Sequence, residues 1–217
     1  RAIAGRRRIM PDKARVAVFV SGRGTNMAAL LYASRLPGCP YEIGLVASND
    51  PEAEALTLAE AEGVATFALS HKGMKRAEHD AAMEQAALDA SAQYIVLAGY
   101  MRILTPEFVR RWEGRMLNIH PSLLPAFAGG MAPEPQAAAL RAGVKISGCT
   151  VHVVTDDLDA GPIVAQAEYP VLDDDTSESL MVRMFERGAE LLARTLPAWD
   201  SGELTGKPQD DSLATHS

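Results

Sequence analysis

Short strand-like runs alternate with helix-like segments along the first half of this 217-residue chain. The segments between the runs place apolar residues at helical spacing, as in PEAEALTLAEAEG and KRAEHDAAMEQAALDA. YIVLAGY barely alternates apolar and polar residues, which is typical of a strand buried on both faces. Such repeated units predict an α/β fold, with an open, mostly parallel, Rossmann-like sheet and helices on both faces. The strand-like runs are RVAVFV (15–20), YEIGLVA (41–47), VATFALS (64–70) and YIVLAGY (94–100).

The second half of the chain does not continue this alternation. Two strand-like runs come in direct succession, SGCTVHVVT (147–155) and PIVAQAEYPVL (162–172). One long helix is then expected over residues 176–196.

One domain is predicted for residues 15–200, because this length suits a single core and the sequence has no internal repeat. It consists of a first half (15–100) and a second half (101–200). The basic start, residues 1–14, lacks the apolar stretch of a signal peptide and is interpreted as a disordered arm. The polar residues 201–217 are expected to fray as a tail.

The charge of the chain limits its partners. Its formal net charge is −7 and its pI about 5.3, whereas proteins that bind nucleic-acid backbones are usually basic. No apolar run approaches the ~20 residues of a membrane span. We therefore expect small-molecule substrates, with no nucleic acid and no membrane as partners. Cys39 and Cys149 lack CxxC or metal-ligand spacing, so no metal site and no disulfide is predicted, and a reducing cytoplasm is favoured.

The turn SGRGTN, Ser21 to Asn26, joins the first strand to a helix. Its glycines allow the backbone to approach a ligand, and the helix start offers free N–H groups at the positive end of the helix dipole. The turn is therefore a candidate phosphate site. An ordinary turn capped by Thr25 or Asn26 is an equally good interpretation, because the motif is neither GxGxxG nor a Walker A loop.

Asn118, Ile119 and His120 precede the stiff stretch PSLLP. In an extended segment, side chains two positions apart share a face, so Asn118 and His120 point into one space while Ile119 turns to the core. Pro121 keeps His120 out of helical geometry. An amide donor beside an imidazole suits a carbonyl oxygen that becomes an oxyanion. A histidine that only satisfies hydrogen bonds within its loop is the competing interpretation.

The turn TDDLDAGP begins at Thr155 and supplies three aspartates. Asp156 and Asp157 suit a solvated turn, whereas Asp159 lies where the chain returns to a strand. A carboxylate next to an imidazole favours its protonated form and fixes its tautomer. A metal site built from these aspartates and a histidine is the alternative, but metal-ligand spacing is missing.

The polar features all follow strand-like runs. They are SGRGTN, Arg102, the pair Asn118 and His120 with the strand-like run RMLNI (115–119), and the turn from Thr155 to Asp159. In open α/β sheets, ligands bind at the carboxyl ends of the strands, so we expect one cleft to hold all four features. The remaining histidines receive no role: His152 is interpreted as a satisfied strand residue, and His71, His79 and His216 as surface residues.

SGRGTN, LAGYMRIL, MLNIHPSLLP and CTVHVVTDDLDAGPIVAQ, in this order and spacing, resemble the folate-dependent formyltransferases, in particular those that act on glycinamide ribonucleotide. The resemblance runs from about Arg15 to Trp199 and implies the formyltransferase fold, with a phosphate-binding first half and a folate-binding, catalytic second half. It implies that the formyl group of 10-formyltetrahydrofolate, a co-substrate, passes to the primary amine of glycinamide ribonucleotide. The amine attacks directly, through a tetrahedral intermediate. No metal is implied, and a cytoplasmic monomer or homodimer is expected.

Matching positions gives each residue a role. Asn118 and His120 would stabilise the oxyanion, with His120 as the acid. Asp159 would favour protonation of His120 and assist proton transfer. The substrate phosphate would be held by Gly24, Thr25 and Asn26. The residues of the folate pocket would be Arg76, Met101, Arg102, Ile103, Leu104, Asn118, Thr155, Asp156, Asp157, Leu158 and Asp159.

The chain departs from the family pattern on the side of the amine substrate. After NIHPSLLP the family usually reads Pro-Gly-x-His, whereas residues 127–135 contain no histidine and the segment to Gly143 is a few residues longer. A Gln-Glu-His run in the last helix is replaced by residues 185–189, with Glu186 two positions early. The formyl donor is therefore better supported than the acceptor. The alternatives are a formyltetrahydrofolate deformylase, against which Pro121 argues, a different amine acceptor, or a non-catalytic nucleotide-binding module.

Overall fold

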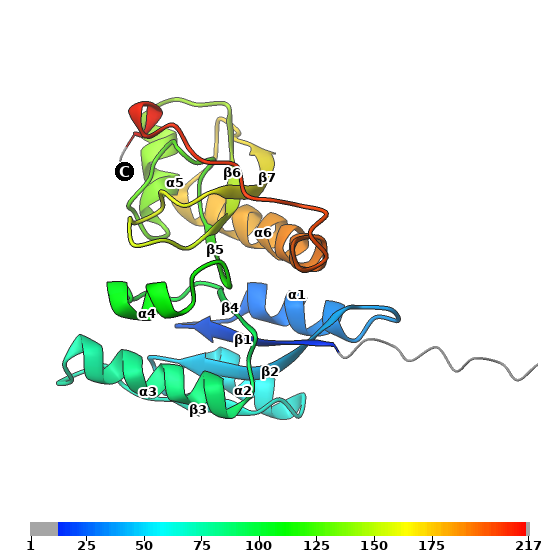
Figure 1. The fold of residues 1–217 in the computed structure, drawn as a ribbon. Coiled ribbons are helices and arrows are strands. Elements are labelled where there is room, and N and C mark those ends of the chain that lie inside the picture. Colours follow the sequence, from blue (N-terminus) through cyan, green and yellow to red (C-terminus); the bar gives the residue numbers. More distant parts are fainter. Residues whose placement is uncertain (1–12, 216–217) are drawn as a thin grey trace, which may run out of the picture.

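The computed structural model describes residues 13–215 as a seven-stranded sheet flanked by helices (Figure 1). In chain order the elements are β1 (Ala14–Val20), α1 (Thr25–Ser34), β2 (Tyr41–Ser48), α2 (Glu54–Ala61), β3 (Thr66–Ala68), α3 (Arg76–Asp89), β4 (Tyr94–Leu97), α4 (Pro106–Arg111), β5 (Met116–His120), α5 (Glu134–Arg141), β6 (Ile146–Val153), β7 (Ile163–Pro170), α6 (Ser177–Asp200) and the 3-10 helix η1 (Asp211–Leu213).

The strands lie in the order β3-β2-β1-β4-β5-β6-β7. The pairs from β3 to β5 are parallel, whereas β6 is antiparallel to both of its neighbours. The prediction of an open, mostly parallel sheet is confirmed. The chain first winds outward from β1 to β3 and then returns to the other side of β1 with β4. The edge between β1 and β4 is therefore the switch point at which such sheets bind ligands.

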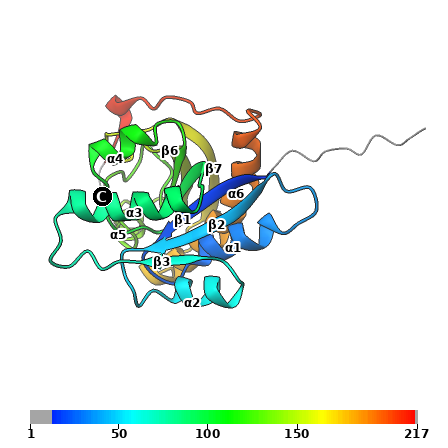
Figure 2. The same ribbon diagram turned by 60° about the horizontal axis from the view of Figure 1, so that its bottom comes forward.

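Side-chain alternation along the strands divides the core between the two faces of the sheet. In β1, Val16, Val18 and Val20 belong to one buried cluster. Ala17 and Phe19 belong to the other. The first cluster includes side chains of α1, α2 and α6, and the second includes those of α3 and α4. In Figures 1 and 2, α1 and α3 lie on opposite sides of β1 and β2.

Side-chain caps mark the starts of two helices. The Thr105 hydroxyl accepts the N–H of Phe108 at the start of α4, with Pro106 as the first helical residue. Thr176 and Ser179 exchange hydrogen bonds in a capping box at the start of α6. α6 then runs for 24 residues, close to the length expected.

The two ends of the chain differ from the prediction. Residues 1–12 of the expected arm (1–14) lie outside the described residues. The predicted end of the arm is wrong, because Ala14 already begins β1. The expectation that residues 201–217 fray is wrong for the described part of that segment. Lys207 pairs with Ile163, and further hydrogen bonds follow it along the segment.

The prediction that His79 is a surface residue is also wrong, because its side chain is fully buried. It shares the inner face of α3 with Met83 and Ala87, four and eight positions further on, and its Nε2–H donates to the Leu69 carbonyl at 2.8 Å. His71 is half-buried beside it. His216 lies outside the described residues.

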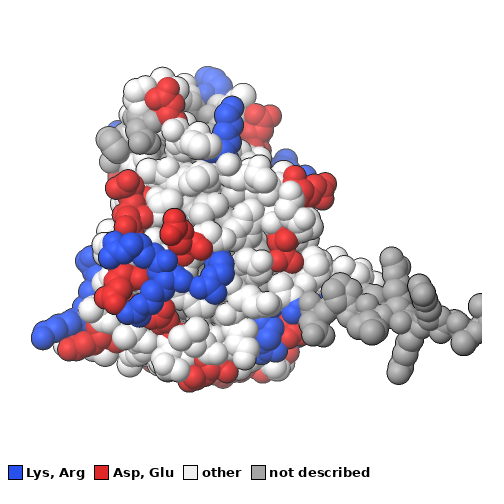
Figure 3. All heavy atoms as spheres, in the orientation of Figure 1, with Lys and Arg blue, Asp and Glu red and all other residues white. Residues whose placement is uncertain are grey.

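The described helices include none that is long and apolar enough to cross a membrane. On the face shown in Figure 3, Lys and Arg side chains are mixed with Asp and Glu, and the largest blue group, on the left of the view, has red neighbours. Ion pairs such as Arg110–Asp156, at 3.0 Å, are of this kind. This face therefore carries mixed charge and no uniformly basic stripe.

Candidate active site

A cavity of about 400 Å³ opens at the carboxyl ends of β1, β4 and β5. The four features expected in one cleft all line it: the glycine turn, Arg102, the Asn118–His120 pair and the loop from Thr155 to Asp159. The loop from Thr155 to Asp159 lines the cavity for a different reason from the one predicted. β6 is antiparallel to β5, and its carboxyl end lies beside Leu117, near the start of β5. The loop after β6 therefore reaches the cavity by folding back.

The turn after β1 leaves the first N–H groups of α1 without a side-chain cap. The alternative in which Thr25 or Asn26 caps the helix is wrong, because the cap position is held by Gly24. This residue has φ +76, and a Cβ there would lie 2.5 Å from the Ala55 Cβ. Only glycine fits, and its small size leaves the N–H groups open to an anion.

His120 and Asp159 meet at the inner end of the cavity. His120 Nδ1 lies 3.3 Å from Asp159 Oδ2, and His120 Nε2–H donates to the Phe127 carbonyl at 3.1 Å. Asp159 Oδ2 also accepts the N–H of Gly129 at 2.9 Å. Both neighbours of the imidazole are acceptors, so the protonated ring satisfies both of its nitrogens. The pairing that the sequence suggested therefore exists as a direct contact.

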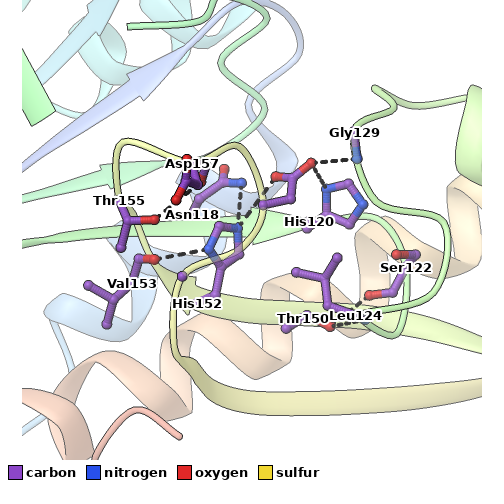
Figure 4. Close-up of polar contacts among 12 residues, drawn as sticks. Asn118, His120, Ser122, Leu124, Gly129, Thr150, His152, Val153, Thr155 and Asp157 are labelled. Carbon is purple, nitrogen blue, oxygen red and sulfur yellow. Dashed lines mark hydrogen bonds and ion pairs between the residues drawn. The ribbon is translucent and has the colours of Figure 1, made fainter. Parts of the chain in front are cut away.

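His152 joins this corner, although the sequence suggested only a structural role (Figure 4). Its Nε2 accepts an N–H of the Asn118 amide at 3.1 Å and lies 3.7 Å from Asp159 Oδ1. Its Nδ1–H donates to the Val153 carbonyl. Asn118 and His152 face each other because they are paired in register across β5 and β6. His152 could have been assigned to the site only from the pairing of β5 with β6, which the sequence of a single strand does not reveal.

The two buried groups next to His120, His152 and Asp159, both have lowered pKa values, but for different reasons. Burial lowers the pKa of His152 to about 4, against the opposing pull of the Asp159 carboxylate, so the ring is neutral near pH 7. Burial alone would raise the pKa of Asp159. Hydrogen bonds and charge from His120, with the Gly129 N–H and His152, outweigh burial and hold that pKa below its ordinary value. The corner therefore contains an ionised carboxylate.

The loop over residues 121–125 is held by the strands behind it. The Thr150 hydroxyl on β6 donates to the Ser122 carbonyl at 2.7 Å and accepts the N–H of Leu124 at 3.0 Å. Gln166 on β7 donates to the same hydroxyl at 2.9 Å and to the Leu124 carbonyl at 3.0 Å. The stiffness of the loop therefore comes from buried hydrogen bonds as well as from its prolines.

Part of the cavity is an apolar slot. Met101, Ile103 and Leu158 line it and expose 46%, 47% and 52% of their surfaces. Large exposed apolar side chains around a cavity of this size suit a flat heterocyclic ligand such as the pterin of a folate. Every predicted folate-pocket residue except Arg76 lines the cavity. Arg76 is exposed at the start of α3, and its role stays a prediction.

The side of the cavity next to α6 has no acidic side chain at the expected place. Glu186 is exposed and does not line the cavity. Two residues later, a Cβ on Gly188 would lie 2.6 Å from Ile119 Cδ1 and 3.2 Å from Asn26 Oδ1. Within residues 13–215, buried Asn26 Oδ1 has no hydrogen-bond partner. This oxygen is therefore open to accept a hydrogen bond.

This arrangement of sheet, cavity and polar corner belongs to a known class. The formyl transferase family model matches residues 14–196, so the chain belongs to the formyl transferase family.

Its relatives include enzymes of purine synthesis. The trifunctional purine biosynthetic protein adenosine-3 of Bos taurus is 46% identical over 177 residues, which make up 81% of this chain but only 17% of that protein. The phosphoribosylglycinamide formyltransferase of Haemophilus influenzae is 35% identical over 92% of each chain. The crystal structure of glycinamide ribonucleotide transformylase 1 from Symbiobacterium toebii has a TM-score of 0.85 at 34% identity, covering 93% of this chain and 96% of that one.

Proposed function

We propose that this chain is a phosphoribosylglycinamide formyltransferase, which moves the formyl group of 10-formyltetrahydrofolate to the primary amine of glycinamide ribonucleotide. The observation that carries the proposal is one cavity with three kinds of site: a helix N-terminus, a corner made by Asn118, His120 and Asp159, and an apolar slot. These suit a phosphate, a formyl oxygen and a flat heterocycle, in that order.

The corner suits direct attack of the amine on the formyl carbon. The formyl oxygen gains negative charge as the tetrahedral intermediate forms, and donors placed there stabilise it. Asn118 supplies one donor. Its amide orientation is set by the bond to His152 Nε2, which the low pKa of His152 keeps free to accept. The second N–H of the Asn118 amide then remains for the oxyanion.

His120 supplies the other donor and is the acid. Its Nδ1–H faces the Asp159 carboxylate at 3.3 Å, which fixes the orientation of the ring. Its Nε2–H, which donates to the Phe127 carbonyl in this structure, is the group that the ring can redirect to the oxyanion. The attacking amine gives up one proton and the departing folate nitrogen gains one, and Asp159 assists this exchange.

The substrates are bound on either side of the corner. Gly24, Thr25 and Asn26 hold the phosphate of the amine substrate at the uncapped start of α1, and Asn26 Oδ1 accepts a further donor. The folate lies in the slot between residues 101–104 and 155–159. Arg76, which is exposed, contacts the part of the folate that projects from the cavity.

Dependence on the amine tests the reaction. The protein is incubated with a 10-formyl folate analogue, and release of the deformylated folate is followed with and without glycinamide ribonucleotide. We expect release only when the amine is present. Equal release without it would mean hydrolysis, the deformylase reaction, and would contradict the proposal. No release in either case would point to a non-catalytic nucleotide-binding module.

Thr25→Asp tests the phosphate site. A carboxylate at the start of α1 competes with the phosphate for the helix N–H groups and repels it, so the KM for glycinamide ribonucleotide should rise about tenfold or more. The KM for the folate should change little. Thr57→Asp, on the exposed face of α2, is the matched control. An unchanged KM for the amine substrate would place the phosphate elsewhere.

A further inference from the structure

The segment after α6 is polar, yet it is bonded to the body of the protein. Residues 204–215, called the return segment, run back across the molecule in Figures 1 and 2. Lys207 exchanges both main-chain hydrogen bonds with Ile163, each at 2.8 Å. A Cβ on Gly206 would lie 2.6 Å from the Pro162 Cβ, so the backbones approach closely. These contacts bring the segment beside the turn that carries Asp159.

Gln209 holds the Asp159 turn directly. Its Nε2 donates to the main-chain oxygens of Asp159 and Gly161, at 2.7 and 2.8 Å. Asp159 has φ +55, a left-handed conformation that residues with side chains rarely adopt. Two hydrogen bonds from one side chain therefore fix a strained peptide and, with it, the direction of the carboxylate.

Thr215 holds the loop on the other side of His120. Its N–H donates to the Pro125 carbonyl at 3.1 Å, and its carbonyl accepts the N–H of Ala128 at 2.7 Å. Its hydroxyl accepts the N–H of Phe127 at 3.0 Å. Phe127 also has a left-handed backbone, with φ +56, and its carbonyl accepts the Nε2–H of His120.

The two oxygens that meet the imidazole thus belong to strained residues, and the return segment bonds to the backbone of both. We propose that the return segment positions the catalytic pair: Gln209 and Thr215 hold Asp159 and Phe127 so that His120 keeps its orientation. None of the residues 204–215 lines the cavity, so the segment acts through the loops and does not touch the substrates. The inference rests on the formyl transfer proposed above.

Substitutions that keep side-chain size test this role. Gln209→Met removes the two side-chain donations, and Thr215→Val removes the hydroxyl acceptor while leaving the main-chain bonds. Thr215→Ser keeps the hydroxyl and serves as the rescue variant. Gln85→Met on α3 and Thr205→Val near the start of the return segment are matched controls, because both side chains are exposed.

We expect Gln209→Met to lower kcat about tenfold and Thr215→Val about threefold, because the half-buried hydrogen bonds contribute more than the exposed one. The KM for the folate should stay within about twofold. Thr215→Ser and both controls should retain the wild-type kcat. Equal kcat values for Gln209→Met and Gln85→Met would overturn the inference. So would a rise in KM without a fall in kcat.

Hydrogen exchange separates this inference from the proposed function. In the double variant Gln209→Met, Thr215→Val, exchange should rise severalfold in residues 125–129 and 159–163 and remain unchanged in β1. If the wild type lacks formyl transfer but exchange rises as expected, the proposed function fails and the hold of the segment on the loops stands. If formyl transfer occurs and exchange in the two loops is unchanged, the inference is overturned.

Discussion

Replacing Asp159 by asparagine removes a charge from the candidate site with little change of shape. Asp159 Oδ2 receives two donors, His120 Nδ1–H at 3.3 Å and the Gly129 N–H at 2.9 Å. The amide oxygen of asparagine fits this position, because both neighbours donate. Its NH2 group then faces His152 Nε2, an acceptor that lies 3.7 Å from Oδ1. The variant therefore keeps the hydrogen bonds and loses the negative charge.

The distance and the burial set the size of the effect. At 3.3 Å, opposite unit charges attract by about 5 kcal/mol at an effective dielectric constant of ~20, and by about 1 kcal/mol in bulk water. His120 and Asp159 are 2% and 7% exposed, so the attraction between them is closer to the value for the effective dielectric constant of ~20 than to that for bulk water. Desolvation of the carboxylate offsets part of it. We expect a loss of about 3 kcal/mol in transition-state stabilisation, which lowers kcat about 100-fold or more.

Steady-state kinetics of formyl transfer, with both substrates varied, measures this loss. The KM values should change by less than about threefold, because the charge acts on the acid and not on ground-state binding. Asp173→Asn, which removes an exposed carboxylate paired with Lys145, is the control and should behave as the wild type. A fall in kcat of less than about fivefold would refute the reasoning that the carboxylate charge supports the acid.

Three further substitutions test the parts that hold the site. The pKa of His152 drops from 6.5 to about 4 on folding. Stability therefore rises with pH between these values, and between pH 7 and pH 4 the wild type should lose about 3 kcal/mol more than His152→Gln in denaturant unfolding. Thr150→Val leaves the Leu124 N–H without its partner and should lower the free energy of unfolding by about 1–3 kcal/mol; a change below ~0.5 kcal/mol would show that the loop does not depend on this hydroxyl. Gly24→Ala places a Cβ 2.5 Å from that of Ala55 at φ +76. It should lower the melting temperature more than Gly38→Ala, which has φ +80 and open space. Equal shifts would mean that only the backbone conformation matters.

The fold followed from local patterns, because each strand–helix unit carries its own periodicity. The runs at 15–20 and 94–100 became β1 and β4, and their order along the chain was enough to predict a mostly parallel sheet. The shared cleft followed from the same rule for the three features that come after parallel strands, whereas the loop from Thr155 to Asp159 reaches it by folding back from the antiparallel β6. Asn118 and His120 could be assigned to one face from their spacing alone.

Features that depend on contacts between distant segments did not follow. His152 enters the site because β6 is antiparallel to β5, and the sequence of one strand does not state its partner. Gln209 looked like part of a frayed tail, because the same polar residue types hydrogen-bond to main-chain groups in one protein segment and to water in another. His79 was misplaced because a polar side chain was assumed to face solvent, whereas its helical position faces the core.

The side of the cavity next to α6 carries a glycine, Gly188, where the family pattern leads one to expect a carboxylate. Gly188 lets α6 approach β5 and α1 so closely that a Cβ would lie 2.6 Å from Ile119 Cδ1. Introducing the carboxylate that the family pattern leads one to expect, as in Gly188→Glu, would therefore require the ends of the Ile119 and Asn26 side chains to move. Under the proposed function, we expect acceptor recognition to depend on the turn at residues 22–26, where Asn26 Oδ1 and the uncapped N–H groups are open to a ligand. We accordingly expect discrimination among amines to be more sensitive to the phosphate of the acceptor than to groups that would lie against α6.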